Sequence, residues 1–225
     1  EQDAESWWSA LRVSIAECVR SLAGRAEEIR ALAITHQRET FVLTNESGAA
    51  LAPALVWMDS RGSERVERLV GRLGRERLRD VSGKPPCITP SFYKLAHLFA
   101  RRPELARAEP RLHAVPSFLV QRLTGRFATS LASADPLGLV DMTRRTWSAE
   151  LTAEVGLTLE QLPALVEPGE VIGEVQAEVA KVIGLPNGLP VVAGAGDGQA
   201  AGLGAGISAP GRAYLNLGTA IVSGV

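Results

Sequence analysis

The segment Val191-Val192-Ala193-Gly194-Ala195-Gly196-Asp197-Gly198-Gln199 leads from a short apolar strand through a glycine-rich turn into a helix of small residues. A carboxylate between a strand and a helix lies at the carboxyl edge of a sheet, where open α/β sheets bind their ligands. The glycines let a ligand or another backbone segment approach closely. Asp197 is therefore a candidate general base. The alternative is that Asp197 only caps the N-terminus of the helix.

The same segment excludes two common nucleotide-binding motifs. No Gly-Lys-Ser/Thr follows, so it is not a Walker loop, and it lacks the acidic residue that completes a dinucleotide fingerprint. A second glycine turn, Asn216-Leu217-Gly218-Thr219-Ala220, lies between two short predicted strands. Its backbone amides and the Thr219 hydroxyl suit a phosphate oxygen, and a plain hairpin turn is the alternative.

A polar run, Thr35-His36-Gln37-Arg38-Glu39-Thr40, separates two apolar segments. Arg38 offers a fork of donors and Glu39 a pair of acceptors, which together suit neighbouring hydroxyl groups. An exposed hairpin corner would have the same composition. His36 has no second histidine nearby in the sequence, which argues against a metal site.

The segment Trp57-Met58-Asp59-Ser60-Arg61 follows the next predicted strand. Trp57 is either a core residue or a flat wall for the carbon face of a polyol. Asp59 is a candidate N-cap of the helix that follows.

The composition is that of a globular α/β protein. The 225 residues are 46% hydrophobic and carry 24 basic against 25 acidic side chains, a balance without the basic excess of a nucleic-acid binder. The apolar residues are too many for a disordered chain and too evenly spread for a membrane span. The two distant cysteines, Cys18 and Cys87, argue against a disulfide framework or a structural zinc and favour the cytosol.

Apolar periodicity predicts strands and helices that alternate along the chain, the pattern of an α/β fold. The expected helices are 6–22, 61–79 with an interruption near Gly71 and Gly74, 92–100, 117–123, 149–155, 177–183 and 199–204. The expected strands are 29–35, 41–43, 54–57, 172–175, 190–193, 214–217 and 221–222.

Together the polar segments resemble the FGGY carbohydrate kinase family. Residues 34–40 are similar to the polyol-contacting segment of glycerol kinases, and 57–61 to the family's Trp-x-Asp-x-Arg element. Residues 132–141 with Trp147 resemble the Ala-Ser…Gly-Leu…Asp…Trp stretch. Residues 194–204 resemble the segment with the catalytic aspartate, and 217–219 the second phosphate-binding turn. Each motif is weak by itself, and five in this order are fairly specific.

The resemblance implies ATP-dependent phosphorylation of a sugar or polyol hydroxyl on the ribonuclease H-like fold shared with actin and hexokinase. Asp197 would accept the proton of the attacking hydroxyl. The substrate contacts would be Arg38, Glu39, Trp57 and Asp197, and the contacts to the ATP phosphates Gly218 and Thr219. Mg²⁺ would bridge phosphate oxygens, without an assigned protein ligand. Nucleic acid and membrane are not expected partners, and a homodimer is a candidate assembly.

Departures from the family patterns leave the substrate open. His97 stands where a tryptophan is expected in Lys94-Leu95-Ala96-His97, and Cys87-Ile88-Thr89-Pro90 lacks the aromatic residue of glycerol kinases. The Met-His pair of xylulokinases is replaced by Arg38-Glu39, yet residues 202–225 are closer to xylulokinase-like members. The expectation is therefore a xylulokinase-like enzyme.

The family's first phosphate-binding loop and its second half are not found in the sequence, which predicts a fold incomplete at both ends. Residues 1–207 would form most of the first, substrate-binding domain, and 208–225 the start of the second, nucleotide-binding domain. Catalysis by this chain alone is then not expected. The alternatives are a non-catalytic polyol- or protein-binding fragment of an actin-like fold and a degenerate structural homologue.

Overall fold

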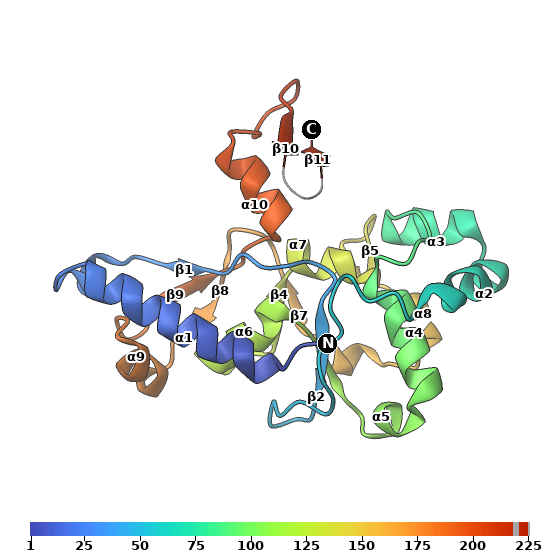
Figure 1. The fold of residues 1–225 in the computed structure, drawn as a ribbon, viewed down its shortest axis with the longest axis horizontal. Coiled ribbons are helices and arrows are strands. Elements are labelled where there is room, and N and C mark those ends of the chain that lie inside the picture. Colours follow the sequence, from blue (N-terminus) through green and yellow to red (C-terminus); the bar gives the residue numbers. More distant parts are fainter. Residues whose placement is uncertain (218–220, 225) are drawn as a thin grey trace.

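A three-stranded sheet carries the glycine-rich segment. The computed structural model describes residues 1–217 and 221–224 and has a mixed α/β fold (Figure 1). The sheet orders β1 (Leu32–Ala33), β9 (Pro190–Val192) and β8 (Val171–Glu174). β1 runs parallel to β9 and β8 runs antiparallel to it. Because β9 is the middle strand, the turn that follows it leaves the sheet beside the end of β1.

One hydrophobic core packs helices against this sheet. Its helices are α1 (Ala4–Ser21), α6 (Val115–Thr124) and α9 (Ala177–Ile183). α1 presents partly buried apolar side chains at spacings of three and four, as its sequence predicts. Trp7 packs edge-on against Phe118, with ring centroids 5.8 Å apart. Burial of this apolar stripe is what fixes α1 against the rest of the chain.

A second core lies on the other side of the fold (Figure 1). It forms around the antiparallel pair β2 (Phe41–Thr44) and β3 (Arg111–Ala114) and the helices α2 (Ser63–Leu73), α3 (Arg75–Ser82) and α4 (Ser91–Arg101). Gly74, with φ of 85°, separates α2 from α3, whereas Gly71 continues the helix. The predicted interruption of the helix near Gly71 and Gly74 is therefore confirmed, and it falls at Gly74.

The remaining elements are short. They are η1 (Ala26–Glu28), α5 (Pro103–Arg107), the parallel pair β4 (Ala128–Ser130) and β7 (Ala164–Val166), α7 (Leu131–Ala134), η2 (Asp135–Leu137), the antiparallel pair β5 (Val140–Asp141) and β6 (Thr146–Trp147), α8 (Ala149–Glu154), η3 (Leu159–Gln161), α10 (Asp197–Gly204) and the antiparallel pair β10 (Tyr214–Leu217) and β11 (Ile221–Gly224). In Figure 1, α10 and the β10–β11 pair project from the rest of the chain, and the Tyr214 hydroxyl donates to the Gly198 carbonyl at 2.8 Å. No described helix is long and apolar enough to cross a membrane.

Two strand predictions differ from the structure, and the strands β3 to β7 were not predicted. Residues 54–57 make only isolated bridges, one of them between Phe41 and Leu55. The pairing ends there because the chain turns at Val56, where the Asp59 amide donates to the Val56 carbonyl. The strand expected over 29–35 is paired only at Leu32–Ala33. β3 was not predicted, because its four residues include an arginine and a histidine that hide the apolar run.

Candidate functional site

Close backbone contact brings the glycine-rich turn beside the polar run. Beyond the paired strands, His36 and Gly196 form a parallel bridge, and the Asp197 amide donates to the His36 carbonyl at 2.9 Å. A Cβ atom on Gly194 would lie 2.3 Å from the Ile34 carbonyl oxygen. Only glycine permits this approach, so Gly194 is what lets the two segments lie side by side.

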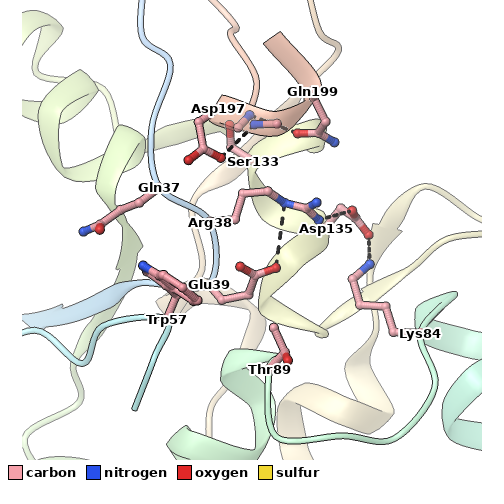
Figure 2. A network of polar contacts seen from close by, with 12 residues as sticks. Gln37, Arg38, Glu39, Trp57, Lys84, Thr89, Ser133, Asp135, Asp197 and Gln199 are labelled. Atoms are coloured by element: carbon pink, nitrogen blue, oxygen red, sulfur yellow. Dashed lines mark hydrogen bonds and ion pairs between the residues drawn. The ribbon is translucent and has the colours of Figure 1, made fainter. Parts of the chain in front are cut away.

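Asp197 is the first residue of α10, and Gly196 occupies the N-cap position. The alternative that Asp197 is the N-cap is therefore wrong. Its side chain is exposed, and its Oδ1 accepts the Gly198 amide at 2.8 Å. The Gln199 side chain accepts the Gly196 amide at 2.9 Å. The carboxylate is thus held at the helix N-terminus, and Figure 2 shows it above Arg38 at the edge of the site.

Arg38 passes over the turn at Gly196. A Cβ atom there would lie 2.5 Å from Arg38 Cγ, so the second glycine of the turn makes room for the arginine stem. Arg38 Nη2 lies 3.5 Å from Asp135 Oδ2, and Arg38 Nε lies 3.7 Å from Glu39 Oε1. The guanidinium is consequently held between two carboxylates.

Glu39 has a left-handed backbone conformation, with φ of 57°. Consecutive residues of an extended segment point to opposite faces, and this turn instead lets Arg38 and Glu39 face the same site. The Ser91 hydroxyl fixes the turn by donating to the Glu39 carbonyl at 2.8 Å. Burial raises the pKa of Glu39, and the positive charge of Arg38 opposes this shift.

Glu39, Arg38, Asp135 and Lys84 form a row of alternating charges, here called the charge row (Figure 2). The Lys84 ammonium contacts the second oxygen of Asp135. The sequence predicted only the Arg38–Glu39 half of this row. Asp135 lies 97 residues from Arg38 and 51 from Lys84. No local pattern links residues at such separations, so their pairing required the fold.

Trp57 forms another wall of the site. Its side chain is 48% exposed, so the alternative that it is a core residue is wrong. Lys94, which is 1% exposed, donates to the carbonyl oxygens of Trp57 at 3.2 Å and of Thr89 at 2.8 Å. Burial lowers the pKa of Lys94, and the charge of Glu39 opposes this shift. Lys94 therefore ties two loops of the site to α4.

His36 connects the polar run to α7. Its Nδ1 lies 2.8 Å from the Gln37 carbonyl and its Nε2 lies 2.9 Å from Ser133 Oγ. A carbonyl can only accept, so Nδ1 is the donor, and Nε2 of a neutral His36 accepts a hydrogen bond from the Ser133 hydroxyl. Burial lowers the pKa of His36, which favours this neutral form.

The structure also decides other site predictions. Asp59 is not a helix N-cap, because α2 begins at Ser63 after Gly62 and Asp59 instead accepts the Arg61 amide at 2.9 Å. Gly218 and Thr219 lie outside the described residues. Within the described part of the chain, no three His, Cys, Asp or Glu side chains are grouped to hold a metal ion.

The fold is the mixed α/β, ribonuclease H-like fold of the actin and hexokinase type, and the site carries an exposed carboxylate, Asp197, at the start of the helix that follows β9. A crystal structure of xylulose kinase from Rhodospirillum rubrum superposes with a TM-score of 0.90 at 28% identity, over 97% of this chain and 45% of the other. The family model for the N-terminal domain of the FGGY family of carbohydrate kinases matches residues 1–204. The chain belongs to this family.

Curated relatives carry three enzyme names, xylulose kinase, glycerol kinase and L-fuculokinase. Xylulose kinase from Escherichia coli K12 is 31% identical over 223 residues, and glycerol kinase from Myxococcus xanthus is 32% identical over 228 residues. Each alignment covers 97% of this chain. The chain spans 44% and 45% of the length of these two relatives.

Proposed function

We propose that the protein transfers a phosphoryl group from ATP to a hydroxyl of a sugar or polyol, as a xylulokinase-like enzyme. The observation that carries this proposal is the exposed Asp197 carboxylate, which follows the middle strand of the sheet and lies beside Arg38. Family membership and the names of the relatives support the same chemistry.

Asp197 would act as the general base. Phosphoryl transfer depends mostly on positioning and on neutralising charge, so the base needs only to orient the hydroxyl and accept its proton late. The bond from the Gly198 amide to Oδ1 holds the carboxylate in one orientation. Oδ2 would then receive the proton of the attacking hydroxyl.

The neighbouring residues would bind the rest of the substrate. Arg38 would donate to its hydroxyl groups and Glu39 would accept from them, because both face the site from one turn. Trp57 would pack against the carbon face. Gly218 and Thr219 would contact the phosphates of ATP.

Magnesium would supply charge neutralisation at the phosphates. Mg²⁺ in such sites takes several ligands from substrate phosphates and water and only one or two from carboxylates. We assign no residue of this chain to the ion.

The test is a phosphorylation screen of the complete gene product with glycerol, erythritol, xylulose and ribulose. Asp197→Asn should lower kcat by about 10²- to 10⁴-fold, the usual value of general acid–base catalysis, with an unchanged Tm. The matched control is Asp80→Asn, because Asp80 is an exposed carboxylate in α3 that pairs with Arg79. Near-normal turnover of Asp197→Asn would refute the assignment of the base. Failure on every substrate would favour the non-catalytic binding protein.

A further inference from the structure

Asp135 is the one member of the charge row that contacts two cations. Its Oδ2 lies 3.5 Å from Arg38 Nη2, and its Oδ1 contacts the Lys84 ammonium. The side chains of Asp135 and Lys84 are 16% and 19% exposed. Ion pairs so far removed from water are screened less by salt than surface pairs are. Asp135 therefore pairs with both cations, and Glu39 supplies the second negative charge of the row.

Lys94, the buried cation of the site, already has hydrogen-bond acceptors. Lys94 donates to the carbonyl oxygens of Trp57 and Thr89 and is 1% exposed, so it does not reach a ligand. Arg61 pairs with Asp59 at the far end of the Trp57 loop. Each of these cations already has an acceptor within the described residues.

On this basis, and resting on the proposed function, we propose that Asp135 is a specificity-determining residue that keeps sugar acids out of the site. An anionic substrate would need Arg38 or Lys84 as its partner, and both are held by Asp135. The carboxylate of an anionic substrate would also approach the negative charges of Glu39 and Asp197. The site therefore accepts neutral sugars and polyols.

The physical reason is the cost of exchanging partners. To bind a substrate carboxylate, Arg38 or Lys84 would have to release Asp135, and a partly buried carboxylate would lose its partner. Leaving one member of such a pair without its partner is more costly than the pair is favourable. Discrimination against an unwanted ligand through an unpaired charge is a common way to achieve specificity. A hydroxyl group makes no such demand, because it can bind while the charge row stays intact.

The test replaces the charge of Asp135 and keeps its shape. In Asp135→Asn, Lys84 loses its carboxylate partner and Arg38 keeps only Glu39, and the complete gene product should gain activity toward a sugar acid. We expect the ratio of kcat/KM for xylulose to kcat/KM for gluconate to fall by about tenfold or more, the value of one hydrogen bond to a charged group. The added substitution Lys84→Met should reverse part of this gain.

A matched control removes one carboxylate elsewhere. Glu167 pairs with Arg145, and both side chains are about half exposed. Glu167→Gln should leave the substrate ratio unchanged. Asp135→Ser is a second variant in case Asp135→Asn does not fold, and thermal unfolding verifies each protein. An unchanged ratio in a folded Asp135 variant would overturn the proposal.

The proposed function and this inference fail in different ways. If the wild-type protein phosphorylates none of the sugars, the proposed function fails. Calorimetric titration with gluconate then still tests Asp135. Tighter gluconate binding by Asp135→Asn than by the wild type supports the inference, and equal binding by the two proteins overturns it.

Discussion

The charge row and the protein interior place ionisable side chains in opposite surroundings. In the row, the four side chains are 14% to 30% exposed and pair with one another. In the interior, Lys94 contacts backbone carbonyls and the His113 ring contacts the rings of Phe118 and Phe127, at centroid distances of 6.1 and 4.8 Å. Lys94 and His113 are 1% and 0% exposed.

The difference teaches which property each region controls. A partly exposed pair can meet a substrate, so changes in the charge row should alter substrate preference. A fully buried group cannot change its charge or partner without breaking the packing around it. Changes in the interior should therefore alter the free energy of unfolding, and the following substitutions test this division.

The largest effect is expected at Lys94. Lys94→Met keeps the length of the side chain and removes both hydrogen bonds to the carbonyls of Trp57 and Thr89. Because hydrogen bonds from a charged group contribute about 1.5–3 kcal/mol each and loss of the buried charge offsets part of this, the free energy of unfolding should fall by about 3 kcal/mol. Urea unfolding measures the loss. Lys181→Met, at an exposed position of α9, is the control and should change little.

An intermediate effect is expected from the protonation of His113. Burial lowers the pKa of His113 to about 3, from an ordinary value of 6.5. As the pH falls below 6.5, the unfolded chain binds a proton that the folded chain does not bind until about pH 3, so stability decreases through this window. Between pH 7 and pH 5 the wild type should lose about 2 kcal/mol that His113→Leu does not lose. Equal losses in urea unfolding at these two pH values would contradict this.

The smallest effect is expected at Gly196, which lies against the stem of Arg38 in the charge row. The methyl group of Gly196→Ala would lie 2.5 Å from Arg38 Cγ and would displace the guanidinium from Glu39 and Asp135. We expect KM for the sugar to rise about tenfold, the loss of one charged hydrogen bond, with a small change in Tm. Gly71→Ala is the control, because a Cβ atom there meets nothing within 4 Å. A KM equal to that of the wild type would show that the row does not depend on this contact.

Much of the fold could be predicted from local patterns. The apolar spacing of α1 and the short strand before the glycine-rich turn are local signals, and the structure confirms both. β3 was missed because four residues with two polar side chains carry little periodicity. The strand predicted over 54–57 is reduced to single bridges at Ala54 and Leu55, because the chain turns at Val56 before the pairing continues.

For the site, too, the sequence identified candidate residues and the structure showed how they are arranged. Asp197, Arg38, Glu39 and Trp57 were candidates because their chemistry lies in short polar segments next to predicted strands. The structure brings Arg38 and Glu39 to one face and places Asp197 and Trp57 around them (Figure 2). Their roles in binding and catalysis stay predictions.

The sequence by itself determined the glycine-rich turn, the polar run and the family resemblance, because each depends on residues close together in the chain. The tertiary structure alone decided that Asp135 and Lys84 complete the charge row and that Lys94 holds the two loops. These contacts join residues from separate elements. Only the packing of those elements, set by burial of the two cores, brings the charges within reach of one another.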